Sequence, residues 1–181
     1  LRKSVINGSQ NLLTKCQSIE MVMDAFFQIG RLSSGGVSEL RGNGQLINKK
    51  ILIESGSFNE DTVTDDLDLS VRLLLFGSEI GILWDPPVME EAVETLPALF
   101  AQRQRWAEGG LQRFFDYGSD LIFGKINILK KFDIFYFFIL QYALPIISLS
   151  DLVSSLFFMR TPIYLPISMT AFILSAMASW F

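Results

Sequence analysis

The chain has 181 residues, half of them hydrophobic, and a formal net charge of −4. An acidic balance gives no electrostatic reason to bind nucleic acid. The chain contains no histidine and one cysteine, Cys16, which excludes a His-based catalytic triad, a zinc finger and a disulfide framework. Any general base must therefore be a carboxylate, and any metal ligand an oxygen atom.

The N-terminal third contains one clear helical pattern. Apolar side chains over residues 9–30 recur every three or four positions, which predicts an amphipathic helix that ends near Gly30. Residues 31–44 are rich in Gly and Ser, so we expect a loop or short strand. Residues 45–53, QLINKKILI, fit either a strand or a short helix, and their periodicity does not decide between the two.

Two further helices follow. An acidic loop leads into the segment DLDLSVRLLLF, which predicts a helix that stops at Gly77. Residues 79–84, EIGILW, are expected to form a short buried strand closed by Asp85-Pro86-Pro87. A third helix is expected to begin near Pro97, because proline suits a first helical turn, and to run to Gly118.

The composition changes after Lys131. Residues 134–159 carry a single acid, Asp151, before the turn, and are long enough to span a membrane, with Pro145 as an expected kink. A second uncharged run, residues 163–181, ends with the chain. We therefore expect two spans, of which the second could be truncated.

The positive charges predict the orientation of these spans. Lys125, Lys130 and Lys131 precede the first span, whereas Arg160 alone lies in the turn, so the polar part should face the cytoplasm. The alternative, a pair of buried core helices, is disfavoured because so short a chain has too little polar protein to cover this apolar surface.

The segment TDDLDLSVRL is crowded with carboxylates, namely Asp65, Asp66 and Asp68. One interpretation is structural, because Thr64 is able to cap the helix and the helix dipole favours acids in its first turn. Asp66 and Asp68 also spell a D-x-D metal motif, although that motif normally lies in a loop at a strand end. The excess of acids, with Glu60 and Asp61 just upstream, favours a function.

The segment QRQRWAEGG, residues 102–110, also has two interpretations. Arg and Trp side chains on a helix near a membrane commonly act as interfacial anchors. Alternatively, Gln102, Arg105 and Trp106 share one helix face at i, i+3 and i+4. Such a face would present a guanidinium to a diphosphate and an indole ring to a sugar.

The combination of motifs resembles the processive family 2 glycosyltransferases, membrane enzymes typified by cellulose, chitin and hyaluronan synthases. In that family a T-E-D motif supplies the catalytic base, which Thr64-Asp65-Asp66 would provide here. The family's Q-x-x-R-W motif, on an interfacial helix, matches residues 102–106. Residues 40–52 resemble the family's glycine-containing acceptor segment, and Gly56-Ser57-Phe58 resembles the G-G-F before T-E-D.

This resemblance implies an α/β fold in three regions. Residues 1–118 would be the C-terminal half of a GT-A domain, residues 119–131 an interfacial segment, and residues 132–181 a transmembrane region. The protein would be a multi-pass protein of the cell membrane, in contact with lipid and with its catalytic part in the cytoplasm.

The resemblance also implies roles for individual residues. Asp66 would deprotonate the acceptor hydroxyl in an inverting transfer, with Asp65 beside it in place of the family's Glu. The donor would be a nucleotide-diphosphate sugar and the acceptor a growing polysaccharide or a glycolipid. The expected substrate-binding residues are Gln102, Arg103, Arg105, Trp106, Gly42, Asn43 and Gly44.

Each of these residues has an expected task. Arg105, together with Arg103, would neutralise the diphosphate leaving group. Trp106 would stack on the acceptor sugar, which favours processive synthesis over transfer of a single sugar. Residues 42–44 would let the backbone approach the acceptor closely.

The donor half of the family's domain is not recognisable in this sequence. Its uridine-binding aspartates and metal-binding D-x-D should precede Leu1, so ligands for Mg²⁺ or Mn²⁺ are expected outside this chain. The chain is therefore expected to be a fragment of a longer transferase. The alternative is a non-catalytic membrane module or a degenerate remnant of a transferase.

Overall fold

A computed structural model describes residues 1–178 of the chain. The chain forms two compact units, Leu1–Lys131 and Phe132–Phe181, which are described separately. The last three residues of the second predicted span, 179–181, lie outside the described part.

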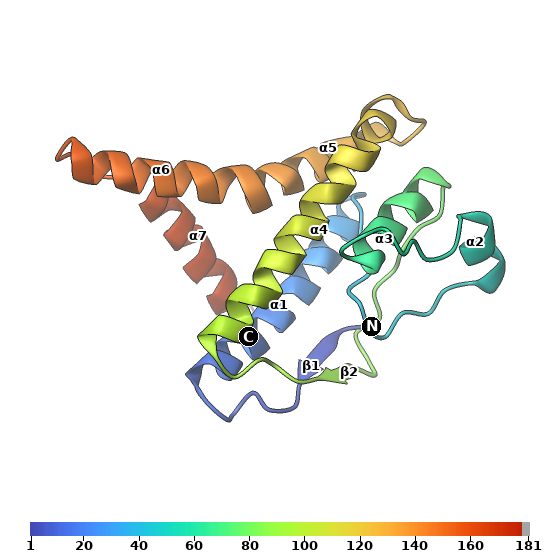
Figure 1. Cartoon of the computed structure of the whole chain (residues 1–181), viewed down its shortest axis with the longest axis horizontal. Coiled ribbons are helices and arrows are strands. Elements are labelled where there is room, and N and C mark those ends of the chain that lie inside the picture. The colour runs from blue at the N-terminus through green and yellow to red at the C-terminus, as the bar shows by residue number, and fades with distance from the viewer. Residues whose placement is uncertain (179–181) are drawn as a thin grey trace. The chain divides into compact units, whose positions relative to one another are not determined.

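The first unit is mainly helical (Figure 1). Its elements are β1 (Lys3–Val5), α1 (Leu12–Ser33), α2 (Lys49–Glu54), α3 (Asp65–Leu75), β2 (Val88–Glu90) and α4 (Leu96–Phe123). The strands form a two-stranded parallel sheet in which Lys3 lies opposite Val88. An α/β character is therefore present, but within residues 1–178 the sheet has two short strands, and a GT-A domain stays a prediction.

Helix α1 confirms the first predicted helix with shifted ends. It begins at Leu12 because Asn11 and Thr14 form a capping box: Thr14 N donates to Asn11 Oδ1 over 2.9 Å, and Asn11 N donates to Thr14 Oγ1 over 3.1 Å. It continues past Gly30 to Ser33. The chain leaves the helix at Gly35, whose φ of +79° suits a residue without a Cβ.

The ambiguous segment 45–53 forms the short helix α2. Asn48 decides the outcome, because its side chain accepts hydrogen bonds from Lys50 N and Ile51 N and so caps a helix. The two later helices are confirmed as α3 and α4. Helix α4 extends one turn beyond the predicted end at Gly118 and stops at Phe123.

The prediction of a buried strand at residues 79–84 is wrong. In the described structure this segment is neither paired in the sheet nor buried, and Leu83 is 55% exposed. A strand needs a neighbour for its backbone groups. Here β1 pairs with β2 instead, and Leu83 O accepts one hydrogen bond, from Arg2 N.

An apolar core cluster of this unit is built on one side of α3. Leu69 and Leu73 are buried together with Leu40. Partly buried side chains surround them, namely Ile47, Ile51, Leu52 and Ile80. This packing holds α2 and residue 40 against α3, and therefore fixes the first turn of α3 relative to the segment that follows Leu40.

The second unit is formed by apolar helices. Helix α5 (Ile128–Phe138), which begins in the first unit, passes through a π-helical segment, η1 (Ile139–Ala143), into α6 (Leu144–Phe157). The π-helical turns directly precede Pro145, where a kink is expected, since proline lacks the N–H that would continue the ladder. Helix α7 (Tyr164–Ala178) follows.

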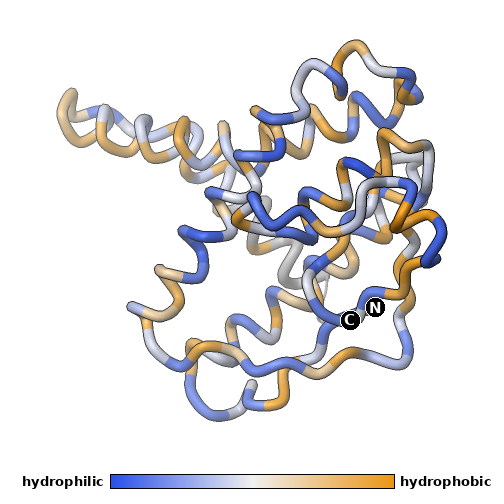
Figure 2. The backbone as a smooth tube through the Cα atoms, turned by 45° about the vertical axis from the view of Figure 1, so that its right-hand side comes forward, coloured by the Kyte–Doolittle hydropathy of each residue, from blue (hydrophilic) through white to orange (hydrophobic). Residues whose placement is uncertain are grey.

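One described helix, Ile128–Phe157, is long and apolar enough to cross a membrane, judged by length and composition. Figure 2 shows hydrophobic residues on most turns of α6. Among residues 1–178 it is the one helix that meets both criteria, so the second span stays a prediction. Asp151 of α6 binds the start of α7, since its Oδ2 accepts hydrogen bonds from Ile163 N over 2.6 Å and from Tyr164 N over 2.8 Å.

Candidate functional site

The candidate base, Asp66, lies in the first turn of α3 and is half-buried. Its Oδ1 accepts a hydrogen bond of 2.9 Å from Leu67 N, and Asp65 Oδ1 accepts one of 3.0 Å from Asp66 N. Burial raises the pKa of the Asp66 carboxyl, and the neighbouring charge of Asp65 adds to the rise, against the opposing effects of the Leu67 N–H and Arg41. A carboxylate with a raised pKa is a stronger base than an ordinary aspartate.

Gly42 lies directly beside Asp66. A Cβ atom on Gly42 would be 3.8 Å from Asp66 Oδ2, and the φ of Gly42 is +79°. The serine of α3 explains this proximity: Leu40 N donates to Ser70 Oγ over 2.8 Å, and Ser70 Oγ donates to Asp66 O over 2.7 Å. The structure thus brings together two of the motifs singled out in the sequence.

The other members of this predicted group lie differently. Asn43 is exposed. Gly44, with a φ of +71°, packs against Val88 of β2, and a Cβ at Gly44 would collide with the Val88 side chain. Asn43 and Gly44 line an open cavity of about 260 Å³ that also includes Glu39 and Arg41 but not Asp66.

Helix α4 packs against the residue that precedes the two aspartates. A Cβ on Gly109 would lie 2.8 Å from Thr64 Cβ, and closer still to its hydroxyl and methyl groups. The adjoining loop is also fixed, because Val63 N donates to Gln112 Oε1 over 3.1 Å. The T-D-D motif and the helix of the Q-R-Q-R-W motif are therefore in direct contact.

This contact corrects the expected role of Thr64. Thr64 occupies the N-cap position of α3, but its side chain makes no capping hydrogen bond. Its Oγ1 is instead buried and has no hydrogen-bond partner in the described part of the chain, because the side chain is packed against Gly109 of α4.

The arginines of Q-R-Q-R-W have different surroundings. Arg103 forms a 2.6 Å ion pair with Glu20 of α1, and its guanidinium lies 4.3 Å from the centre of the Trp106 ring. Arg105 is exposed, and in the described part of the chain no carboxylate lies within ion-pair distance of it. The structure therefore pairs Trp106 with Arg103 and leaves Arg105 available to a ligand.

Gln102 is half-buried on the same helix. Its Oε1 is buried and has no hydrogen-bond partner among residues 1–178. A buried amide oxygen without a donor is costly, and a substrate hydroxyl would satisfy it.

Sequence reasoning missed a network of charged residues behind Asp66. Glu39 is buried among three arginines, with Arg113 Nη1 at 3.0 Å, Arg41 Nη1 at 3.4 Å and Arg31 Nη1 at 3.8 Å. Although burial alone would raise it, these guanidinium groups hold the pKa of Glu39 below its usual range. Arg41 also pairs with Asp24 of α1 at 2.8 Å.

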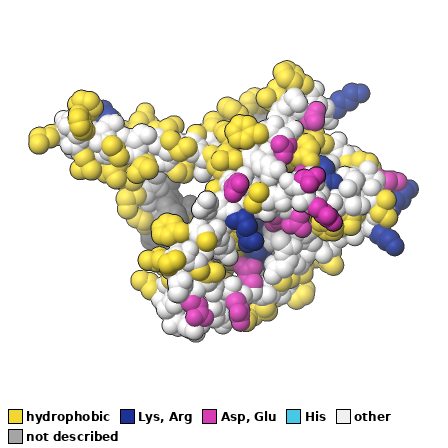
Figure 3. All heavy atoms as spheres, in the orientation of Figure 1, with side chains coloured by type: hydrophobic (Ala, Val, Ile, Leu, Met, Phe, Trp, Pro, Cys, Tyr) yellow, Lys and Arg dark blue, Asp and Glu magenta, His cyan; other side chains and the backbone are white. Residues whose placement is uncertain are grey.

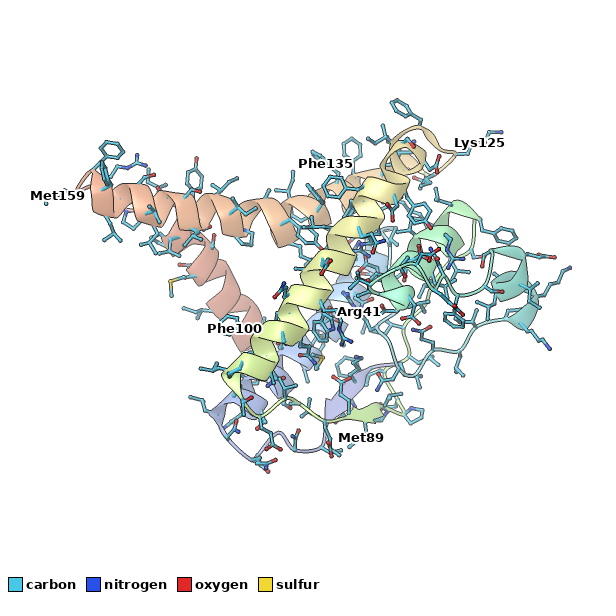
Figure 4. The ribbon with its side chains drawn as sticks, in the orientation of Figure 1. Arg41, Met89, Phe100, Lys125, Phe135 and Met159 are labelled. Carbon is cyan, nitrogen blue, oxygen red and sulfur yellow. The ribbon has the colours of Figure 1, made fainter. Side chains whose placement is uncertain are left out.

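The figures place this network in the first unit. Figure 4 labels Arg41 in the first unit, and Figure 3 shows basic side chains bordered by acidic ones on one face of that unit. The sequence offered one faint signal, a Glu and an Arg two positions apart just before Gly42 in a segment rich in Gly and Ser. It could not show their partners, which come from α1 and α4.

Asp68 is a structural residue. It is buried, its Oδ2 accepts from Arg72 Nε over 2.7 Å, and its Oδ1 accepts from the Tyr117 hydroxyl over 2.7 Å. Burial, with the hydrogen bond to Asp68, raises the pKa of Tyr117 to about 12. Both oxygens of Asp68 are occupied, so Asp66 and Asp68 do not form a metal site.

The described residues also do not fit a divalent cation elsewhere. Within residues 1–178 there is no group of three or more acidic or cysteine side chains that could hold a metal ion. No step of a reaction is therefore assigned to a metal bound by this chain.

Comparison with known proteins decides the family. Residues 2–181 match the family described as "Glycosyl transferase family group 2". The chain belongs to this family. The resemblance to family 2 glycosyltransferases is thereby confirmed at the level of the family.

Three curated relatives are glycosyltransferases of known or probable specificity, judged by their names. A beta-monoglucosyldiacylglycerol synthase from Synechocystis sp. is 45% identical over 94% of this chain and 36% of its own length. One from Nostoc sp. is 42% identical over 93% of the chain and 36% of its own length. A probable glucomannan 4-beta-mannosyltransferase 7 from Oryza sativa subsp. japonica is 28% identical over 95% of the chain and 30% of its own length.

The chain thus spans about a third of the length of the curated relatives it matches. No solved structure matches it. The relatives named here are glycosyltransferases that are not specifically cellulose, chitin or hyaluronan synthases.

Proposed function

We propose that the full-length protein is a membrane-bound, inverting glycosyltransferase that moves a hexose from a nucleotide-diphosphate sugar to a lipid acceptor. Membership of the family supports the reaction class. The names of the relatives at 41–45% identity, all beta-monoglucosyldiacylglycerol synthases, support a diacylglycerol-type acceptor. The apolar helix Ile128–Phe157 supports attachment to the cell membrane, with the first unit on its cytoplasmic side.

The observation that carries the proposal is the convergence of three segments at the start of α3. Asp66 has Gly42 beside it, and α4 packs on the preceding Thr64. A general base must lie next to open space in which the hydroxyl can approach. Gly42 provides that space, because it has no side chain on the side that faces Asp66 Oδ2.

Asp66 acts as the base in this scheme. Its carboxylate takes the proton of the acceptor hydroxyl as the new bond to the sugar forms and the bond from the sugar to the diphosphate breaks. Asp65 orients it, because Asp65 Oδ1 accepts the hydrogen bond from Asp66 N.

The residues of α4 receive the other substrate groups. Arg105, which has no acidic partner among residues 1–178, stabilises the charge that develops on the departing diphosphate. The ring of Trp106, which lies beside the Arg103 guanidinium, packs on a sugar, and Gln102 Oε1 accepts a hydrogen bond from a substrate hydroxyl. Mg²⁺ or Mn²⁺ would be held by residues of the full-length protein outside this chain.

Processive synthesis of a polysaccharide is the alternative, and the rice relative is named for a glucomannan. The lipid acceptor is preferred because the relatives named for a monoglucosyl lipid are more similar to the chain. Mass spectrometry of the product distinguishes the two: a lipid with one added hexose supports single transfer, and a series of longer products supports processive synthesis.

The test of the base is Asp66→Asn in the full-length protein, assayed in membranes with radiolabelled nucleotide sugar and diacylglycerol. Loss of the base should lower turnover about 10²–10⁴-fold. Asp61→Asn is the matched control, because Asp61 is an exposed acid of the same loop, and it should retain turnover. Wild-type turnover in Asp66→Asn would remove Asp66 from this role.

A further inference from the structure

The segment that leads to Gly42 is buried, yet in the described structure it takes no part in the two-stranded sheet. Its backbone N–H groups are bound by side chains instead. Glu39 N donates to Gln28 Oε1 of α1 over 3.0 Å, and Leu40 N donates to Ser70 Oγ of α3 over 2.8 Å. Gln28 and Ser70 are both 2% exposed. The segment therefore depends on two buried side chains for hydrogen bonds that a neighbouring strand would otherwise provide.

The Ser70 hydroxyl is used both as an acceptor and as a donor. Its Oγ accepts the Leu40 N–H and also donates over 2.7 Å to the carbonyl oxygen of Asp66, one turn earlier in α3. A serine hydroxyl has a single proton, so donation to Asp66 O turns a lone pair toward Leu40 N. Ser70 thus joins the backbone at Leu40 to the backbone at Asp66 through one oxygen atom.

The two ends of this bridge are the two halves of the proposed site. On one side, Gly42 follows two residues after Leu40, and a Cβ on Gly42 would lie 3.8 Å from Asp66 Oδ2. On the other side is the residue that carries the proposed base itself. A movement of either end would change the space beside the carboxylate in which an acceptor hydroxyl has to fit.

Apolar packing alone does not fix this space. Leu40 also lies with Leu69 and Leu73 in the core cluster, but hydrophobic contact is not directional and would permit the segment to slide along α3. A hydrogen bond to one oxygen atom defines a single position. Ser70 therefore sets the register of Leu40 against α3.

We propose that Ser70 is a positioning residue for the proposed transfer: by binding Leu40 N and Asp66 O through one hydroxyl group, it sets the gap between Gly42 and the Asp66 carboxylate. This inference rests on the proposed role of Asp66 as the base. It assigns a task to a buried residue outside the T-D-D and Q-R-Q-R-W motifs.

The variant that tests this bridge is Ser70→Ala. It keeps the apolar contacts of Leu40 but leaves the buried Leu40 N–H without its acceptor, which is costly. The segment should then shift toward another acceptor and carry Gly42 with it. The acceptor hydroxyl would meet Asp66 in a poorer geometry, whereas binding of the nucleotide sugar should not change.

The experiment measures two KM values of the full-length protein in membranes, with diacylglycerol and nucleotide sugar varied separately. In Ser70→Ala the KM for diacylglycerol should rise about tenfold, the effect of weakening one hydrogen bond to a charged group, and the KM for the nucleotide sugar should stay at the wild-type value. A partly unfolded enzyme has a lower kcat but unchanged KM values, so a difference between the two KM values reports positioning.

Two further variants sharpen the experiment. Ser70→Thr keeps the hydroxyl and should keep a KM for diacylglycerol near that of the wild type. Ser33→Ala is the matched control, because Ser33 Oγ also donates to a carbonyl of its own helix, Gly30 O at 2.9 Å, but is exposed at the end of α1. Both of its KM values should equal those of the wild type.

A wild-type KM for diacylglycerol in Ser70→Ala, or a rise shared equally by both KM values, would overturn the inference but not the proposed function, provided that Asp66→Asn is inactive. A KM for diacylglycerol as high in Ser70→Thr as in Ser70→Ala would also overturn it. If Ser70→Ala does not accumulate as folded protein, Ser70→Cys decides, because sulfur is a weak acceptor: a raised KM for diacylglycerol supports the inference, and an unchanged one overturns it. Full activity of Asp66→Asn would instead overturn the proposed function.

Discussion

The fit between α4 and Thr64 predicts that Gly109 tolerates no side chain. An alanine at this position would place its Cβ 2.5 Å from Thr64 Cγ2 and 2.8 Å from Thr64 Cβ, well inside van der Waals contact. The neighbours are the side chain and Cβ of a short residue at a helix start, so the strain can be relieved only by moving α4 or the loop.

A second glycine of the same helix provides the control. Gly118 also lies inside α4, but a Cβ there would meet no atom of the described residues within 4 Å. Both substitutions to alanine gain the same helix propensity, about 1 kcal/mol. Only Gly109→Ala suffers the overpacking, so the two variants should differ in unfolding free energy by about 1–3 kcal/mol.

The consequence for activity is larger than the consequence for stability. Thr64 directly precedes Asp65 and Asp66, so a displaced Thr64 displaces the base. A shift of about 1 Å at a reacting group costs roughly 10²-fold in rate. Gly109→Ala should therefore lose about this factor in turnover, whereas Gly118→Ala should keep the wild-type value.

Thermal unfolding of the full-length protein in detergent and turnover in membranes measure the two effects. The two positions should also be coupled, because Thr64→Gly removes the Cβ, methyl and hydroxyl groups that collide. The double variant Thr64→Gly/Gly109→Ala should therefore lose less unfolding free energy than the sum of the losses of the two single variants. Equal stability and turnover of Gly109→Ala and Gly118→Ala, or strict additivity with Thr64→Gly, would show that α4 is not fitted against Thr64.

Two further predictions concern buried hydrogen bonds. Tyr117→Phe should lower the unfolding free energy by about 1.5–3 kcal/mol, since it removes a hydrogen bond to the charged Asp68. The pKa of Tyr117 is raised from 10.0 to about 12 in the folded protein, so the stabilisation by this hydroxyl should be complete below pH 10 and lost as the pH rises through 12. If the difference in unfolding free energy between wild type and Tyr117→Phe does not shrink over that range, the hydrogen bond does not have this role. Asp151→Ala should lower the unfolding free energy by about 0.5–2 kcal/mol and expose the turn at residues 158–163 to protease, because two N–H groups at the start of α7 lose their acceptor. Asp151→Asn keeps an acceptor oxygen and should retain most of the protection. Equal protease sensitivity of the two variants would exclude the capping role.

The helices were predictable because their signals are local. The periodicity of residues 9–30 and the proline at position 97 were enough to place α1 and α4. Their exact ends depended on single side chains: the Asn11–Thr14 capping box and the left-handed Gly35 set the limits of α1. Asn48 likewise decided between helix and strand for α2.

The strand at residues 79–84 shows where local signals fail. Its apolar pattern is that of a strand, but a strand forms only where another strand accepts its hydrogen bonds. The sequence of the segment says nothing about whether that neighbour is present. For the same reason the network of Glu39, Arg41 and Arg113 was missed, because it joins residues that are far apart in the chain.

The sequence predicted the candidate site as separate motifs, and the structure shows what the glycines of those motifs contact. The glycines of the two motifs have different tasks: Gly42 leaves room beside Asp66, Gly44 leaves room for Val88, and Gly109 leaves room for Thr64. Two of these three positions bear directly on the T-D-D segment. A motif glycine is thus informative only once its neighbour is known.

The two arginines of Q-R-Q-R-W also differ in their neighbours. Arg103 is ion-paired with Glu20 and lies over the Trp106 ring, so its guanidinium is already engaged within the chain. Arg105, two residues after Arg103, is exposed and has no carboxylate within ion-pair distance among residues 1–178. The motif therefore combines a fixed aromatic surface with a free cation on one helix, and the packing of Gly109 on Thr64 holds that helix beside the proposed base.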